Sequence, residues 1–183
     1  MLSSLLEEYK NQDTLNLRVC SVAVNKGVID QIKHLGRSFS AKDTSKYNRV
    51  KPGDIVYTKS PTGDFPFGIV KQNKLNETVA VSPLYGVYTP QNYETGNLLH
   101  NYFEQYQNTN NYIKPLAQKG AKNTINISNS NFLSAKIPFF KNYAEIIKIS
   151  NTFILIQRQL DNSEKLLNQW TLIKKYLLQK MFI

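Results

Sequence analysis

Short apolar runs alternate with turn-forming and polar residues through the first 140 positions of this 183-residue chain. Such runs, rich in β-branched residues and bounded by Gly, Pro, Asn or Asp, are typical of strands. They predict strands at 15–24, 28–29, 55–57, 67–70, 78–84, 86–88, 125–127 and 133–140. Pro52 followed by Gly53 predicts a tight turn over Val50–Asp54 that leads into the strand at 55–57.

Helical spacing interrupts the strands once in this first part of the chain. From Thr95 onward, apolar residues recur three and four positions apart, which predicts a helix. Asn108–Asn111 is expected to end that helix, and 112–116 to add a short one. Turns are expected at 25–27 and 119–123, and the polar segment 36–49 should be a loop with a short helix after Ser40.

The pattern becomes helical at about Tyr143 and remains so to Met181, without Pro or Gly. Apolar residues form a seven-residue repeat, with Ser163 and Lys174 at the two positions where one is missing. The repeat consists of Ile146, Ile149, Phe153, Ile156, Leu160, Leu167, Trp170, Leu177 and Met181. A helix of this length spans roughly 57 Å. The heptads favour a coiled-coil partner, and a helix folded back over its own sheet is the alternative.

The predicted fold class is therefore α+β. A domain with a mixed or antiparallel sheet and short helices covers residues 1–142, and one long C-terminal coiled-coil helix covers 143–183. Hydrophobic residues make up 41% of the chain, which is enough for the first part to bury a core.

The charge balance points to an anionic partner. Lys and Arg number 23 against 13 Asp and Glu, a formal net charge of +10. Nucleic acid is the first candidate and an anionic membrane surface the second. Residues 26–74 alone contain ten basic and four acidic residues, as a surface that contacts phosphates would. The alternative is that these lysines are scattered over the solvent-exposed surface.

The residues give little support to catalysis. Cys20 is the single cysteine, and His34 and His100 have no metal-ligand spacing, so each is expected to be an exposed or half-buried histidine. Ser82–Tyr85 resembles the Asn/Asp/Ser-Pro-Pro-aromatic loop of amino-methyltransferases, but the second Pro is missing. We therefore expect a binding protein without bound cofactor or metal.

Two pairs of residues could be fitted to the carboxylate–lysine pattern of nucleases. These pairs are Asp54 with Lys59 and Glu145 with Lys148, and neither has a second carboxylate at a suitable spacing. No signal peptide and no apolar stretch of about 20 residues is evident, so we expect a cytoplasmic protein without a membrane partner.

Several segments, taken in order, resemble the specificity subunit of type I restriction–modification systems, the methylase-S family. The matching segments are Val50–Tyr57, Val79–Tyr85, Gly120–Asn123 with 125–128, Ile137-Pro138 with Glu145, and Leu177–Phe182. Each segment is weak alone, but their order and spacing are fairly specific, and together they span nearly the whole chain.

The resemblance implies a target recognition domain followed by a conserved-region helix. A full subunit of the family contains two such units, and this chain matches one, as a natural half-subunit or a cloned half would. The resemblance further implies double-stranded DNA as ligand and methyltransferase subunits as partners, with the restriction subunit contacted indirectly. Two copies, or this chain and a second half-subunit, would pair through their helices and read a bipartite site. S-adenosylmethionine, ATP and Mg²⁺ would be bound by the partner subunits.

Three positions depart from the family pattern. Phe140 stands where a second Pro is common, and Ile146 where Gln is common, which puts the docking contacts at the helix start in doubt. Lys122 stands where Arg is frequent, and a lysine cannot contact guanine bidentately as an arginine does.

On this basis we predict two sets of binding residues. Expected DNA contacts, chosen by charge and loop position, are Lys26, Arg37, Lys42, Lys46, Lys59, Ser60, Thr62, Lys119, Lys122 and Asn123. The expected helix interface consists of Ile149, Phe153, Ile156, Leu160, Leu167, Trp170 and Leu177. Two other functions stay open: an unrelated basic module with a dimerising stalk that binds RNA or an acidic protein, and a small nuclease.

Overall fold

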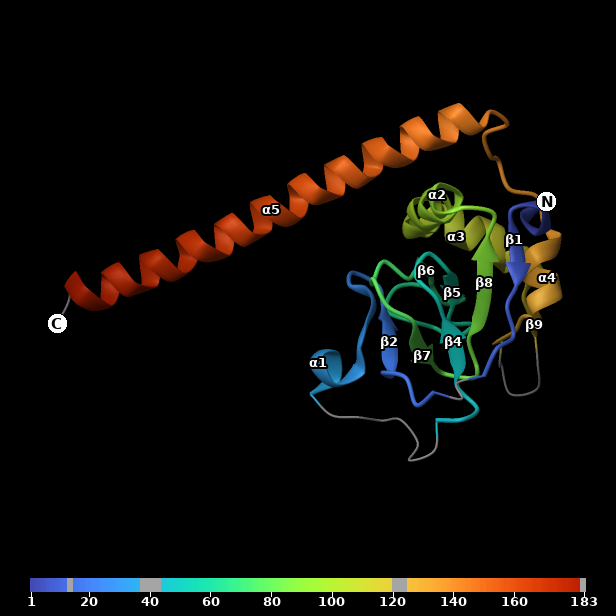
Figure 1. The fold of residues 1–183 in the computed structure, drawn as a ribbon, viewed down its shortest axis with the longest axis horizontal. Coiled ribbons are helices and arrows are strands. Elements are labelled where there is room, and N and C mark those ends of the chain that lie inside the picture. Colours follow the sequence, from blue (N-terminus) through green and yellow to red (C-terminus); the bar gives the residue numbers. More distant parts are fainter. Residues whose placement is uncertain (13–14, 37–43, 120–124, 182–183) are drawn as a thin grey trace. The chain divides into compact units, whose positions relative to one another are not determined.

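A computed structural model describes residues 1–12, 15–36, 44–119 and 125–181 of the chain (Figure 1). The chain divides into two compact units, Met1–Lys141 and Asn142–Ile183. The first unit, called the head below, is α+β with antiparallel sheets, and the second is one long helix, α5 (Tyr143–Met181). The α+β class and the long C-terminal helix predicted from the sequence are confirmed.

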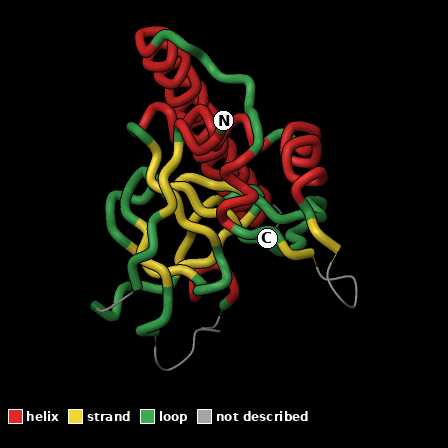
Figure 2. Tube along the Cα trace, turned by 90° about the vertical axis from the view of Figure 1, so that its right-hand side faces the viewer, coloured by secondary structure: helices red, strands yellow, loops and turns green. Residues whose placement is uncertain are grey.

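A four-stranded antiparallel sheet forms the centre of the head. Its strands run in the order β1 (Leu6–Glu8), β8 (Gly86–Pro90), β5 (Ile55–Tyr57) and β6 (Val70–Gln72). Three two-stranded sheets surround it: β2 (Cys20–Ala23) with β3 (Gly27–Asp30), β4 (Asn48–Val50) with β7 (Val79–Val81), and β9 (Gln118–Lys119) with β10 (Ile125–Asn126). Figure 2 shows these strands together in the head, with helices flanking them.

The helices of the head are short. They are η1 (Leu2–Ser4), α1 (Gln31–Leu35), α2 (Tyr93–Glu104), α3 (Tyr106–Ile113), η2 (Lys114–Leu116) and α4 (Asn129–Ser134). Side-chain caps explain where three of them begin, because Asp30, Asn92 and Ser128 each accept a hydrogen bond from a backbone N–H three residues later.

The central strand β5 (Ile-Val-Tyr) is buried on both faces, which explains why it is apolar throughout. Ile55 and Tyr57 of β5 face one core, which α2, α3 and α4 cover with residues such as Phe103 and Phe132. Val56, between them, faces a second core made with the smaller sheets β2–β3 and β4–β7. Because side chains alternate along a strand, one short strand supplies both cores.

The turn predicted at 50–54 is confirmed. The N–H of Asp54 donates to the carbonyl of Lys51 at 3.1 Å, and Gly53 has φ +89°, a conformation that favours glycine. The carboxylate of Asp54 accepts from the N–H of Lys51 at 2.8 Å and from the hydroxyl of Thr89 at 2.9 Å. The turn is thereby fixed to strand β8.

The strand predicted at 133–140 is wrong. Residues 129–134 form α4, because Ser128 caps the helix and Phe132 turns into the first core. Residues 135–142 have no regular structure, so the segment before the long helix does not complete the sheet. Asn108–Asn111 were also interpreted wrongly: α2 ends at Glu104, and these asparagines lie inside α3.

Other boundaries moved by a few residues. The strand expected at 67–70 is β6 at 70–72, and the one expected at 15–24 is β2 at 20–23. Helix α1 was not predicted, although Asp30 is a typical cap. The expected helix after Ser40 and the turn at 120–123 lie in segments outside the described residues.

His100 is buried in the head, contrary to the expectation of an exposed or half-buried histidine. Its Nδ1 accepts from the N–H of Gln72 at 3.2 Å, so its Nε2 carries the proton and donates to Glu104 at 3.2 Å. Burial lowers the pKa of His100, which keeps the ring neutral. The hydrogen bond from His100, with that from Lys71, lowers the pKa of Glu104 to about 2. These contacts link α2 to β6.

Helix α5 begins as the sequence predicts. The side-chain Oδ1 of Asn142 accepts from the N–H of Ala144 at 2.9 Å, and the backbone carbonyl of Asn142 accepts from the N–H of Ile146 at 3.1 Å. Glu145 lies in the first turn, where the positive end of the helix dipole stabilises a carboxylate. The helix then continues for 39 residues.

Candidate nucleic-acid interface

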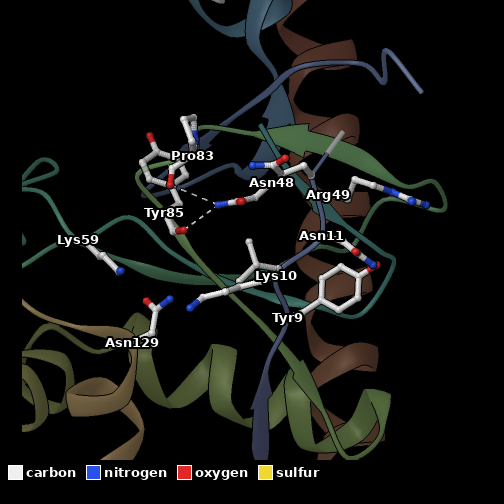
Figure 3. A pocket seen from close by; sticks show the side chains of 11 residues that line it. Tyr9, Lys10, Asn11, Asn48, Arg49, Lys59, Pro83, Tyr85 and Asn129 are labelled. Atoms are coloured by element: carbon white, nitrogen blue, oxygen red, sulfur yellow. Dashed lines mark hydrogen bonds between the residues drawn. The ribbon is translucent and has the colours of Figure 1, made fainter. Parts of the chain in front are cut away.

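A polar pocket of about 550 Å³ opens on the surface of the head (Figure 3). It is lined by residues from the segment after β1, from β4, from the loop after β5, from the turn between β7 and β8, from β8 itself and from the start of α4. These are Tyr9, Lys10, Asn11, Gln12, Asn48, Arg49, Lys59, Pro83, Tyr85, Val87 and Asn129. Three cationic side chains and four side-chain amides are thus gathered around one cavity.

Lys59 enters the pocket from an unusual backbone conformation. Its φ is +56°, which is uncommon for a residue with a side chain and costs on the order of 1–3 kcal/mol. Gly68 allows the two segments to approach closely, because a Cβ at position 68 would lie 3.0 Å from the backbone nitrogen of Lys59 and 2.8 Å from the hydroxyl oxygen of Thr58. The loop that carries Lys59 is therefore fixed by contacts at its base.

The charges near Lys59 are unbalanced. Lys59 is half-buried, and burial lowers the pKa of its ammonium group; Glu8 acts to raise that pKa, and repulsion from Lys10 lowers it further. Among the described residues Lys59 has no ion-pair partner. Figure 3 shows Lys10, Lys59 and Asn129 pointing toward one another.

Glu8 holds the other two members of this group in place. Its carboxylate accepts from Asn129 Nδ2 at 2.6 Å and pairs with the ammonium of Lys10 at 3.0 Å. Burial acts to raise the pKa of Glu8, but these hydrogen bonds outweigh it and lower the pKa below its usual range. The hydroxyl of Tyr88 donates to Asn129 Oδ1 at 3.0 Å, which fixes the orientation of the amide. Both functions of the Asn129 amide are therefore used within the head.

Asn48 fixes the opposite rim of the pocket. Its Nδ2 donates to the carbonyl of Tyr85 at 3.0 Å and lies 3.4 Å from that of Pro83. The turn itself closes through the N–H of Tyr85, which donates to the carbonyl of Ser82 at 3.1 Å. The segment that resembles a methyltransferase loop is therefore a turn at the rim of this pocket.

Arg49 extends toward the other end of the pocket, away from Lys59 (Figure 3). Its backbone pairs with Ala80 in the β4–β7 ladder, which fixes its position. Its Nε is buried and has no hydrogen-bond partner among the residues that the structure describes. A buried N–H of this kind is costly unless a ligand or water accepts from it.

The structure brings one of the ten predicted DNA contacts, Lys59, into the pocket. Lys26 lies in the β2–β3 turn and Lys46 before β4, both exposed and outside the lining. Ser60 and Thr62 hydrogen-bond within their own loop, to the carbonyls of Thr58 and Ser60. Lys119 belongs to β9, with its side chain outside the description. Arg37, Lys42, Lys122 and Asn123 lie outside the described residues.

Sequence reasoning missed most of the lining. Lys10 and Asn11 follow a three-residue strand, and Asn129 opens α4, a helix that was not predicted. Asn48 and Arg49 could have been identified as candidates, because they are two polar residues directly before the apolar Val50. Their pairing with residues far along the chain could not be read from that pattern.

Helix α5, considered by itself, exposes the apolar stripe predicted for it. Ile149 is half-buried, and the other six predicted interface residues are between 41% and 66% exposed in the single chain. Exposed apolar side chains also lie outside the heptad positions, most of them from Leu166 onward. They include Ile154, Leu155, Leu166, Leu172, Ile173, Tyr176 and Leu178. One partner helix would cover only part of this wider surface.

The described residues contain no candidate metal site and no candidate membrane span. None of their His, Cys, Asp and Glu side chains form a group of three that could hold a metal ion. Among the described helices, none combines the length and apolar character needed to cross a membrane. Within the described part of the chain, the polar pocket and the stripe of α5 are the strongest candidate sites.

Comparisons with known proteins add no family assignment. No family model matches the sequence, and a comparison with curated proteins finds no match. Any function assigned to the chain rests on its own residues and their arrangement.

Proposed function

We propose that this chain is a half-size DNA-sequence specificity subunit of a type I restriction–modification enzyme. Its head would read one half of a bipartite DNA site, and its long helix would pair with a second half-subunit, an identical chain in the simplest case. The chain itself would perform no catalysis. Methyltransferase subunits docked on it would modify the DNA, and a restriction subunit would cleave it.

One observation carries the proposal: a cation-rich polar pocket and an uncovered apolar helix stripe occur in separate units of one chain. A net charge of +10 favours a polyanionic ligand, and the pocket collects three of the cations. Side-chain amides beside them are the groups that hydrogen-bond to base edges. The apolar stripe of α5 favours pairing with another helix, because exposed leucine and tryptophan side chains at heptad spacing are stabilised by burial.

The roles of the residues follow from their chemistry. Lys10, Arg49 and Lys59 would contact phosphates, which positions the head on DNA without reading sequence. Exposed Lys26 and Lys46 would extend that contact, together with the predicted cations outside the described residues. The remaining apolar surface after Leu166 would pack against methyltransferase subunits, since it exceeds what one partner helix covers. S-adenosylmethionine, ATP and Mg²⁺ would be bound by those partner subunits.

The proposal is tested by selecting DNA from a random duplex pool with the purified chain and methyltransferase subunits at moderate salt. Selection should enrich a bipartite sequence with mirrored halves, bound at least about 10³-fold more tightly than random DNA. A chain that cannot pair through α5 should instead enrich a single half-site.

The same selection separates the second candidate function, a basic nucleic-acid-binding module with a dimerising stalk, unrelated to restriction. The charge and the stripe favour this function as well. It predicts tight but sequence-independent binding, with affinity that falls steeply as salt rises. A pool that remains random after repeated rounds would contradict the specificity-subunit proposal and favour this alternative.

A further inference from the structure

The pocket contains more positive charge than the head neutralises. Lys10, Arg49 and Lys59 line it, and Glu8 is the carboxylate beside them. Glu8 pairs with Lys10, while Lys59 and Arg49 have no ion-pair partner among the described residues. A half-buried ammonium and a buried guanidinium nitrogen without partners are both stabilised when an anion binds.

Two of the polar side chains at the lysine end of the pocket are preorganised for a ligand. Lys59 is fixed by a left-handed backbone conformation, and Asn129 by hydrogen bonds from Tyr88 and to Glu8. Strained backbone of this kind persists where surrounding contacts hold it, and it is concentrated at binding sites. Lys10 pairs with Glu8 at 3.0 Å, but its side chain is 78% exposed, so its ammonium group can shift toward a ligand.

The size of the cavity exceeds what a simple anion needs. A volume of about 550 Å³ lies in the range of sites for small organic ligands. Amides line the part of the pocket beyond the lysines. Asn48 and Asn11 each use their Nδ2 within the head, toward Tyr85 and Tyr9, which leaves their Oδ1 atoms as acceptors for the amino group of a base.

We propose that this pocket binds one nucleoside monophosphate unit. The phosphate would lie between the ammonium groups of Lys10 and Lys59, and the base beside Asn11 and Asn48. The nucleotide belongs either to a DNA strand, from which it would be unstacked, or to a free mononucleotide. The first source rests on the proposed function and deepens it, and the second does not depend on it.

The test is a titration of the full-length ¹⁵N-labelled chain, followed by NMR, with each deoxynucleoside 5′-monophosphate and with inorganic phosphate. Amide signals of residues 10–12, 48–49, 59 and 129 should shift with at least one nucleotide at lower concentration than with phosphate. Lys59→Asn should weaken that binding about 10-fold, because asparagine tolerates the left-handed backbone but lacks the charge. Lys136→Asn, the same change at an exposed lysine outside the pocket, should leave the titration unchanged.

A second variant and a second ligand complete the design. Lys10→Gln should weaken binding as well, and since Lys10 is exposed it should not affect folding. A short single-stranded oligonucleotide that shifts the same signals at lower concentration than mononucleotides identifies a strand as the source. If it does not, a free nucleotide is the source.

Two results would overturn the inference: equal shifts with phosphate and every nucleotide, or equal titrations of the Lys59 and Lys136 variants. The DNA selection is read separately. An enriched bipartite sequence without nucleotide binding would contradict the inference about the pocket and support the proposed function. Nucleotide binding without any enriched sequence would support the inference about the pocket and contradict the proposed function.

Discussion

Replacing Phe153 and Leu160 together by aspartate is expected to leave the chain monomeric, whereas the unchanged chain is expected to form the dimer proposed above. Both residues belong to the heptad stripe and are exposed in the single chain, so pairing of two α5 helices would bury them. A carboxylate buried in such a seam without a partner costs several kcal/mol, and each dimer would contain four. We expect the dissociation constant to rise by at least about 10³-fold, measured by sedimentation equilibrium.

The matched control introduces the same two charges on another face of the helix. Asn151→Asp with Asn162→Asp changes two exposed positions outside the stripe and should leave the dimer intact. Far-ultraviolet circular dichroism of both variants reports whether the helix persists. A double variant at Phe153 and Leu160 that remains as dimeric as the parent would place the interface elsewhere.

Phe132→Ala is expected to destabilise the head by about 3–5 kcal/mol. Phe132 is fully buried and its ring contacts three tyrosines, with centroids 4.6 Å from Tyr57, 5.1 Å from Tyr88 and 5.7 Å from Tyr112. Alanine would leave a cavity where α4 packs on the sheet. A loss of this size is a large part of the total stability of a typical domain, about 5–15 kcal/mol.

Urea unfolding followed by near-ultraviolet circular dichroism of the tyrosines measures this effect. Trp170, the single tryptophan, lies in α5 and would report on the other unit. Phe140→Ala, the same change at a 44% exposed side chain, should cost less than about 1 kcal/mol. Equal losses at the two positions would contradict the assigned core.

The core and the pocket are linked through α4. Phe132 anchors this helix, and Asn129 at its first turn hydrogen-bonds to Glu8 beside the pocket. The hydroxyl of Tyr88 donates to the same asparagine, and the centroid of the Tyr88 ring lies 5.1 Å from that of Phe132. Loosening the core at Phe132 should therefore disturb the pocket before the head unfolds.

The long helix was predictable because heptad periodicity over 39 residues is a local signal that no other element imitates. Strands β5 and β8 were predictable for a similar reason, as β-branched runs follow the turn at Gly53 and the turn at Ser82–Tyr85. The strand predicted at 133–140 was wrong because an apolar run with a Pro resembles an edge strand. The Ser128 cap and the packing of Phe132 in the aromatic core instead make residues 129–134 a helix.

The pocket could not be predicted in the same way. Glu8 and Asn129 are 121 positions apart, and their contact depends on how α4 packs on the central sheet. Charge density led to the loop residues between 26 and 74, and of these Lys59 reaches the pocket. The cations that complete it occupy different positions: Lys10 follows β1, and Arg49 is the middle residue of β4. Composition distinguishes neither position.

The most direct test of the proposed function is a map of DNA methylation in cells that contain the methyltransferase subunits, with and without this chain. The proposed function predicts that a bipartite sequence is methylated when the chain is present and unmethylated when it is absent. It further predicts that the Phe153 and Leu160 double variant does not restore this methylation, whereas the Asn151 and Asn162 control does. Identical methylation in cells with and without the chain would contradict its role as the subunit that determines sequence.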